Sequence, residues 1–240
     1  MKSYNEQLTA LRASGNLRHL PEVEHQGIWI LKEGMRMLNL SSNDYLGLAS
    51  RQDLQEEFQA STQDRFYPYS SSSSRLLTGN FSVYTKLEKQ IARSFDREAA
   101  LIFNSGYHAN TGILPALTDK QTLLLADKLV HASIIDGILL SGSPFLRYRH
   151  NDYDQLERLV QKNACQYETI IILTESIFSM DGDVADLNRL IAIKRQYPNI
   201  LLYVDEAHAI GARGKTGLGI AEEQGCIQEI DLLVGTFGKA

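Results

Sequence analysis

An acid and an amine each follow an apolar run near the end of this 240-residue chain. The run 201–204 leads into Asp205, with His208 three residues later, and the run 232–234 leads through a short segment into Lys239. Apolar runs of this length are typical of parallel strands covered on both faces, and such sheets bind ligands at the carboxyl ends of their strands. We therefore expect Asp205, His208 and Lys239 to meet at one edge of a sheet.

The types of these groups indicate a carbonyl cofactor. A lysine among apolar neighbours has its ammonium form disfavoured, so Lys239 can act as an imine-forming nucleophile. Asp205 follows four apolar residues, and a buried carboxylate is costly unless a cation pairs with it. A protonated pyridine nitrogen would be such a cation, and His208 would reach a phenolic oxygen on the same ring. The non-functional alternative is that Lys239 is a solvent-exposed lysine at a strand end.

Alternating elements must position these groups. Apolar runs predict strands at 99–103, 122–126, 144–148, 169–174, 200–205 and 231–235. Apolar residues at helical spacing, or polar helix-compatible runs, predict helices at 3–14, 52–66, 82–95, 153–162 and 187–197. Ser3 and Glu6 fit a capping box for the first of these, and 28–40 fits a small hairpin. This alternation predicts an α/β fold with a mainly parallel sheet covered by helices on both faces.

Four strings carry a resemblance to a known family. They occupy 43–48, 178–183, 203–208 and 236–240. Together they resemble the α-oxoamine synthases, pyridoxal-phosphate (PLP) enzymes of the aspartate-aminotransferase fold, fold type I. The resemblance implies that Lys239 holds PLP as an imine and that Asp205 keeps the ring nitrogen protonated.

The resemblance also implies roles for residues outside the two strand ends. Gly106 and Tyr107 match a pair of residues that binds the cofactor phosphate, and Thr236 matches a threonine that contacts the same phosphate. His131 matches a histidine that stacks on the cofactor ring and faces substrate, and Ser179 matches a serine near the cofactor. Arg18 matches an arginine that contacts substrate. The stretch 104–110 lies between a strand and a helix, where free N–H groups and the helix dipole favour a dianion. Four of these positions also have a purely structural interpretation: a strand-to-helix turn at Gly106, a helix start at His131, a turn at Ser179 and a solvated arginine at Arg18.

The activity that the resemblance implies is the condensation of an amino acid with an acyl thioester, with loss of carbon dioxide. The strings at 106–110 and 174–178 favour L-alanine and pimeloyl-CoA, the substrates of the biotin-pathway member. Glycine with acetyl-CoA and serine with a long acyl chain are alternatives within the family. A non-catalytic scaffold of the same fold is an alternative of a different class, and Lys239 argues against it.

A nucleotide hydrolase is a competing interpretation. Asp-Glu-Ala-His at 205–208 is the signature tetrad of a helicase class, and 209–216 fits a permissive phosphate-loop pattern. A phosphate loop should follow an early strand and precede a helix, with the acidic motif on a later strand. Here the loop pattern comes directly after the acid, so the order opposes this interpretation.

Composition limits the partners. With a net charge of −5 and scattered basic residues, the sequence has no basic patch of the kind that binds nucleic acid. No stretch approaches the roughly 20 apolar residues of a membrane helix. Cys165 and Cys226 lie outside metal-like spacing, which predicts free thiols, no metal and a cytoplasmic location. We expect an arm and hairpin at 1–48, an incomplete large PLP-binding domain at 49–240, and a small carboxyl-terminal domain absent from a partial chain. The resemblance further implies a homodimer with its site at the subunit boundary.

Overall fold

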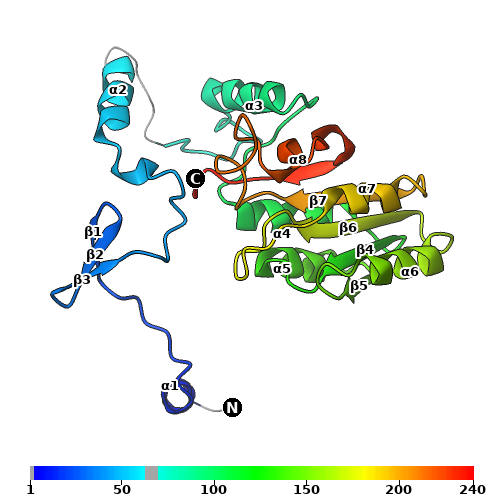
Figure 1. Cartoon of the computed structure of the whole chain (residues 1–240), viewed down its shortest axis with the longest axis horizontal. Helices are drawn as coiled ribbons and strands as arrows, with labels where there is room; N and C mark the ends of the chain where they lie inside the picture. Colours follow the sequence, from blue (N-terminus) through cyan, green and yellow to red (C-terminus); the bar gives the residue numbers. More distant parts are fainter. Residues whose placement is uncertain (1–2, 63–69) are drawn as a thin grey trace. The chain divides into compact units, whose positions relative to one another are not determined.

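The computed structural model describes residues 3–62 and 70–240. The chain divides into two compact units, Met1–Ser42 and Asn43–Ala240, each of which is described by itself. Figure 1 shows the elements of both units. The division predicted after residue 48 stays a prediction.

The first unit contains a capped helix and a small antiparallel sheet. Helix α1 (Tyr4–Ala13) begins at the predicted capping box, in which Ser3 Oγ accepts from the Glu6 N–H and Glu6 accepts from the Ser3 N–H at 2.7 Å. Strands β2 (Trp29–Lys32) and β3 (Met35–Leu38) form the predicted hairpin. Strand β1 (Glu24–Gln26), which pairs with β2, was not predicted, because it is short, exposed and polar.

The second unit contains a parallel sheet. In the part of this unit that the structure describes, the strand order is β5-β4-β6-β7-β8, and every neighbouring pair is parallel. The strands are β4 (Thr122–Asp127), β5 (Phe145–Tyr148), β6 (Thr169–Glu175), β7 (Ile200–Asp205) and β8 (Leu232–Val234). Five of the predicted strands are therefore confirmed within one or two residues. The predicted parallel α/β architecture is confirmed with them.

Helices cover both faces of this sheet, as Figure 1 shows. On one face, α4 (Gly106–Leu117) and α5 (Ala132–Ser141) pack Leu114, Ile134 and Ile138 against strand residues such as Leu124. On the other face, α6 (Tyr153–Asn163) and α7 (Leu187–Lys194) contribute a second apolar core with the alternate strand residues. Since successive strand side chains point to opposite faces, continuous apolar strands supply both cores.

Short or peripheral elements complete the second unit. They are η1 (Leu48–Ser50), α2 (Gln52–Thr62), α3 (Ser82–Ser94), α8 (Ile220–Glu223) and η2 (Ile227–Glu229). Residues 63–66 of the helix predicted at 52–66 lie outside the described residues. Helix α7 ends at Lys194, earlier than the predicted 197. Among the described residues, no helix combines the length and the apolar character needed to cross a bilayer.

The strand predicted at 99–103 is wrong. This segment has no regular secondary structure, although it is rich in apolar residues. Its backbone forms hydrogen bonds with side chains and not with a neighbouring strand. The Ile102 N–H donates to Glu88 at 2.9 Å, and the Ile102 carbonyl accepts from Arg75 at 3.0 Å. Glu88 and Arg75 also form an ion pair, so these two side chains bind each other as well as the backbone of this segment.

Distant segments are joined after α3. Arg97 donates to the carbonyl of Ile227 at 3.1 Å and to that of Asp231 at 2.7 Å. Gln228 donates in return to the carbonyls of Phe95 and Asp96. These contacts connect the end of α3 to the segment that leads into β8.

A buried carboxylate fixes the loop that follows β7. Glu206 is fully buried and accepts from the Ser176 hydroxyl at 2.5 Å, from the Ile220 N–H at 3.1 Å and from the Ala221 N–H at 2.7 Å. Gly219 has a φ of 97°, and a Cβ there would lie 2.6 Å from a Glu206 carboxylate oxygen. Glu206 therefore anchors α8 to the carboxyl end of β6.

We expect Glu206→Gln to lower the free energy of unfolding by about 2–3 kcal/mol. Only one oxygen remains to accept from two backbone N–H groups and a hydroxyl, and the new NH₂ group meets donors. Chemical denaturation would measure the loss, with the exposed Glu98→Gln as the matched control. Equal stability of the two variants would contradict the anchoring role.

Candidate active site

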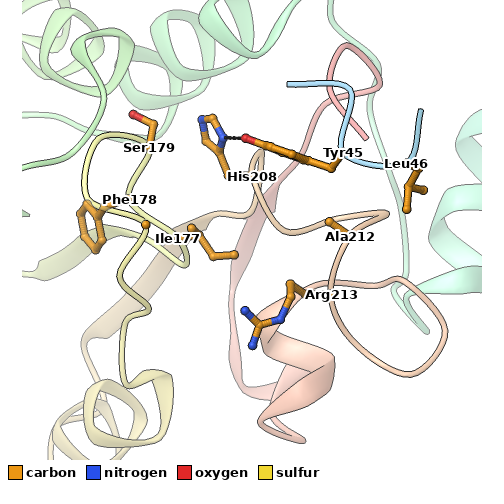
Figure 2. A pocket seen from close by; sticks show the side chains of 9 residues that line it. Tyr45, Leu46, Ile177, Phe178, Ser179, His208, Ala212 and Arg213 are labelled. Atoms are coloured by element: carbon orange, nitrogen blue, oxygen red, sulfur yellow. Dashed lines mark hydrogen bonds between the residues drawn. The ribbon is translucent and has the colours of Figure 1, made fainter. Parts of the chain in front are cut away.

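The three groups predicted to meet at the sheet edge do so. Asp205 ends β7 and pairs in register with Val234, the last residue of β8. The Lys239 amine lies 2.8 Å from His208 Nε2, and the Tyr45 hydroxyl lies 2.7 Å from His208 Nδ1. Figure 2 shows Tyr45 and His208 pointing toward each other. An amine, an imidazole and a phenol thus form one hydrogen-bonded chain.

Burial affects the protonation of the hydrogen-bonded groups His208 and Lys239. Burial lowers the pKa of His208, and the neighbouring Lys239 lowers it further, so the imidazole stays neutral near pH 7. Burial also lowers the pKa of Lys239, although the carboxylates Asp205 and Glu175 oppose this effect. The Lys239 amine therefore loses its proton at a lower pH than an ordinary lysine, as a nucleophilic amine requires.

Asp205 is 6% exposed and is held by neutral donors. Its carboxylate accepts from the Asn110 amide at 3.0 Å and from the Ala207 N–H at 2.9 Å. A carboxylate has about four acceptor positions, so capacity remains for another donor. The arrangement fits a carboxylate that is oriented by its neighbours and still able to bind a cationic N–H.

Glu175 is a second buried carboxylate at this edge. It ends β6, pairs in register with Asp205, and is 3% exposed. Burial is the main cause that raises the pKa of Glu175 to about 7, and the negative charge of Asp205 is the second cause. A hydrogen bond from the His131 N–H and the charge of Lys239 oppose this shift. Glu175 is therefore a group that changes charge near neutral pH.

A polar network links His131 to Asp205. His131 is the N-cap of α5, and its Nδ1 lies 2.8 Å from the Ser133 hydroxyl. Ser133 accepts from the Asn110 amide at 2.9 Å, and Asn110 accepts from the Tyr203 hydroxyl at 2.5 Å. Because Asn110 also donates to Asp205, each hydrogen bond restricts the next.

Gly106 and Tyr107 begin helix α4. Ser105 caps the helix by accepting from the His108 N–H at 3.2 Å. A Cβ at Gly106 would meet open space, with no atom within 4 Å. Tyr107 is 48% exposed and donates its hydroxyl to Asp136 at 2.8 Å. Since Asn110 of the same helix reaches Asp205, the positive end of the helix dipole lies at the same edge as the lysine.

The other predicted site residues have different surroundings. Ser179 is exposed and lines a cavity of about 400 Å³ beside Tyr45 and His208 (Figure 2). Thr236 lies just before Lys239, and its hydroxyl accepts from the Gly238 N–H at 3.1 Å. Arg18 is exposed and belongs to the first unit, so its relation to the site stays a prediction.

The local structure explains the motifs of the competing interpretation. Glu206 of the tetrad is a structural anchor, as described above. In the phosphate-loop pattern, the N–H groups of Thr216 and Leu218 donate at 3.0 Å to the carboxylate of Glu222. A side chain of the protein therefore occupies the anion position of this loop, and both motifs are accounted for without a nucleotide.

Three residues of the site carried no prediction. Glu175 ends an apolar run as Asp205 does, so the same signal would have found it. Asn110 stands alone in a helix, and its partner Asp205 is 95 residues away. Tyr45 lies 163 residues before His208. No local pattern indicates either of these contacts.

Comparison with known proteins gives consistent matches. A family model described as "Aminotransferase class I and II" matches residues 35–240. The whole chain is 58% identical to a protein from Pasteurella multocida (strain Pm70) named "Putative 8-amino-7-oxononanoate synthase". The chain spans 62% of the length of that relative.

Solved structures extend this likeness. A serine palmitoyltransferase from S. paucimobilis with a bound PLP–myriocin aldimine is 26% identical, with a TM-score of 0.85, over 98% of this chain and 59% of that one. The crystal structure of 8-amino-7-oxononanoate synthase from Francisella tularensis is 31% identical, with a TM-score of 0.67, over 83% of this chain and 54% of that one.

We expect the Lys239 amine to be acylated with a midpoint at lower pH in the folded chain than in the chain unfolded by denaturant, because burial lowers the pKa of Lys239. Competitive labelling with trace acetic anhydride, read by mass spectrometry, would give both midpoints. Asp205→Asn should move the Lys239 midpoint of the folded chain lower still, since a carboxylate that stabilises the ammonium is removed. A midpoint in the folded chain at or above that in the unfolded chain would contradict the described environment.

Proposed function

The chain belongs to the class I and II aminotransferase family, and from that premise we propose that it serves the decarboxylative condensation of L-alanine with pimeloyl-CoA, giving 8-amino-7-oxononanoate. The observation that carries the proposal is the half-buried Lys239 amine, bonded to His208 and next to Asp205 at the ends of adjacent strands. A non-catalytic scaffold would have no need of such an amine.

The resemblance to the α-oxoamine synthases is confirmed at the level of the family. Curated relatives along the whole chain and solved neighbours carry names from this family, and the fold is that of its PLP-dependent members. The chain spans less than two thirds of the relatives' length, so the substrates of the whole protein remain our proposal.

The cofactor is pyridoxal 5'-phosphate, which the solved serine palmitoyltransferase contains. The residues present fit it. Helix α4 offers its N-terminus and the open face of Gly106 to a phosphate dianion, Asp205 has acceptor capacity for a ring N–H, and the Lys239 amine has a lowered pKa. When bound, the cofactor supplies an electron sink for the negative charge that develops at the substrate α-carbon.

Each side chain then has a defined task. Lys239 would hold the cofactor covalently and, once released as a free amine, would move a proton to and from the substrate α-carbon. Asp205, oriented by Asn110, would keep a proton on the ring nitrogen. The neutral His208, which lies within hydrogen-bond distance of Lys239, would bind the phenolic oxygen, and His131 would contact the ring and the substrate.

The remaining predicted residues serve binding. We propose that Gly106, Tyr107 and Thr236 hold the phosphate, that Ser179 contacts the cofactor from the cavity wall, and that Arg18 contacts substrate. The cavity of about 400 Å³ beside Ser179 and His208 is the space into which substrate enters. A homodimer with the site at the subunit boundary is part of the same proposal and is supported by the family likeness.

Attachment of the cofactor is the first prediction. The chain incubated with PLP should turn yellow, and borohydride reduction should leave a label on Lys239 that peptide mass spectrometry identifies. Lys239→Ala should abolish the label, whereas Lys215→Ala should retain it. Asp205→Asn should still be labelled, because the amine does not depend on that carboxylate for imine formation. Colourless protein after addition of PLP would overturn the cofactor assignment.

The choice of substrates is the second prediction. The whole protein should release thiol from pimeloyl-CoA with L-alanine faster than from acetyl-CoA with glycine or from a long-chain acyl-CoA with serine. Asp205→Asn should reduce turnover by about 100-fold or more, because the ring nitrogen would lose its proton. Thiol release only with another pair would reject alanine and pimeloyl-CoA while leaving the cofactor assignment intact.

A further inference from the structure

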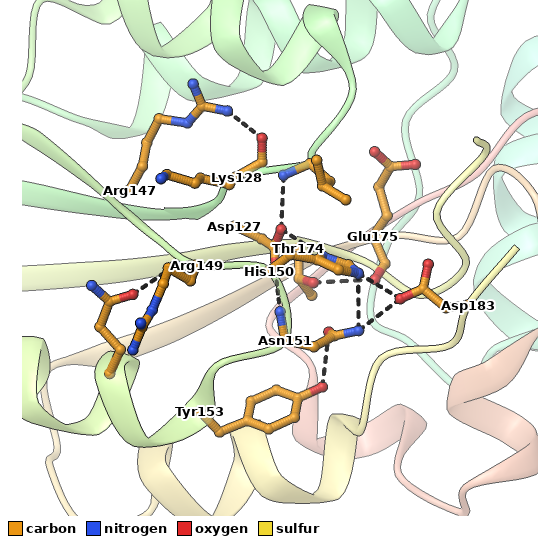
Figure 3. Close-up of polar contacts among 12 residues, drawn as sticks. Asp127, Lys128, Arg147, Arg149, His150, Asn151, Tyr153, Thr174, Glu175 and Asp183 are labelled. Atoms are coloured by element: carbon orange, nitrogen blue, oxygen red, sulfur yellow. Dashed lines mark hydrogen bonds and ion pairs between the residues drawn. The ribbon is translucent and has the colours of Figure 1, made fainter. Parts of the chain in front are cut away.

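A polar cluster lies beyond the groups assigned so far and consists of Asp127, His150, Asn151 and Asp183 (Figure 3). Asp127 ends β4 and is fully buried. His150 and Asn151 follow β5, and Asp183 belongs to the turn 177–184. The cluster thus joins the ends of two strands to Asp183, which lies more than 30 residues further along the chain.

Both ring nitrogens of His150 face carboxylates. Nδ1 lies 2.9 Å from Asp127 Oδ1, and Nε2 lies 2.5 Å from Asp183 Oδ2. A neutral imidazole has a single N–H and would leave one lone pair against a carboxylate, whereas an imidazolium donates to both. The geometry therefore matches the protonated form of His150.

Asp127 and Asp183 are themselves fixed in place. Asp127 accepts from the Leu129 N–H at 2.8 Å and from the Asn151 N–H at 2.9 Å. Asp183 accepts from the Asn151 amide at 2.8 Å. The imidazole therefore bridges two preset acceptors, one of which belongs to the sheet and the other to the turn.

The turn 177–184 forms a wall of the candidate site. Ile177 and Val184 form an isolated bridge, and the Gly182 N–H donates to the Phe178 carbonyl at 2.8 Å. Ile177, Phe178, Ser179 and Gly182 all line the cavity in Figure 2. The Phe178 ring also packs edge-on against His150, with 4.4 Å between the centroids. A bond from His150 to this turn therefore acts on the position of Ser179.

We propose that protonated His150 is a positioning residue that ties the turn 177–184 to the carboxyl end of β4, and that its deprotonation loosens this wall of the site. The part of this inference that concerns cofactor affinity rests on the proposed function. The part that concerns the turn does not, because it follows from contacts within the chain alone.

The electrostatics agree with this geometry. Burial lowers the pKa of His150, but the hydrogen bonds that the imidazole donates to Asp127 and Asp183 outweigh this effect, so the net pKa lies above the ordinary 6.5. For a histidine with a raised pKa, the stabilisation is fully present below pH 6.5 and is lost as pH rises through the folded value. The turn is therefore held below pH 6.5 and released as the pH rises through the raised pKa of His150.

Other charged groups near the cluster need separate consideration. Burial raises the pKa of Tyr148 and of Tyr153, so both stay neutral over this range. Arg149 pairs with Asp152, and Arg147 donates to the Lys128 carbonyl. Glu175, with a pKa of about 7, is the neighbour that titrates in the same window, and its charge is felt by Asp127. A Glu175→Gln variant therefore separates the two groups.

The test follows the turn directly. Hydrogen exchange of the amides in 177–185, expressed as protection relative to the intrinsic rate at each pH, should fall roughly tenfold or more between pH 6 and pH 9. The same loss should occur in Glu175→Gln and in the control His25→Gln, which changes an exposed histidine of β1. His150→Gln should show low protection at every pH.

Asp183→Asn gives the decisive contrast. Neutral His150 can donate Nδ1–H to Asp127 and accept at Nε2 from the new amide, so protection of the turn should persist at pH 9. Imidazole NMR should place the His150 pKa above 6.5 in the parent chain and lower in Asp183→Asn. A parent pKa below 6.5, or equal protection in His150→Gln and the parent at pH 6, would overturn the proposal.

Cofactor affinity supplies a readout that depends on the proposed function. The dissociation constant for PLP, measured by absorbance, should rise with pH in parallel with the loss of protection, and this rise should be absent in Asp183→Asn. If the parent chain binds no PLP, the proposed function fails while hydrogen exchange still decides the role of His150. If PLP binds but its affinity at pH 6 is the same in His150→Gln and in the parent, the positioning role alone is rejected.

Discussion

The placement of a buried carboxylate at the end of β7 is the constraint on which the site depends. Asp205 is almost completely removed from water, and its carboxylate accepts from the Asn110 amide and the Ala207 N–H. Burial without such donors would be strongly unfavourable. The helix that carries Asn110 must therefore dock with its N-terminus at the same sheet edge, and that docking brings Gly106 and Tyr107 there.

The second carboxylate gives this edge its electrostatic character. Glu175 and Asp205 lie side by side on adjacent parallel strands, and their mutual repulsion together with burial makes the proton of Glu175 easy to retain near pH 7. Both attract the Lys239 ammonium, which burial disfavours. The protonation of the amine thus reflects a balance between desolvation and two acids.

Much of the fold and part of the site could be predicted from the sequence. Continuous apolar strands with alternating helices predicted the parallel sheet, and the polar groups directly after two strands predicted that Asp205, His208 and Lys239 meet. The prediction for 99–103 was wrong because an apolar composition also suits a segment without regular structure whose backbone bonds to Glu88 and Arg75. The contacts of Asn110 and Tyr45 depend on tertiary docking over 95 and 163 residues, which no local pattern encodes. The roles of Gly106, Tyr107, His131, Ser179, Thr236 and Arg18 came from resemblance and remain proposals.

The bonds from Arg97 have a consequence for how the chain acquires its structure. Their acceptors lie 130 and 134 residues further along the chain. Closing so large a loop has an entropic cost that must be met before the contact can form, and non-local contacts of this kind slow folding. Because synthesis proceeds from the amino terminus, Arg97 leaves the ribosome long before its acceptors have been made. The contact that joins the end of α3 to the segment before β8 can therefore form only after that segment has been synthesised.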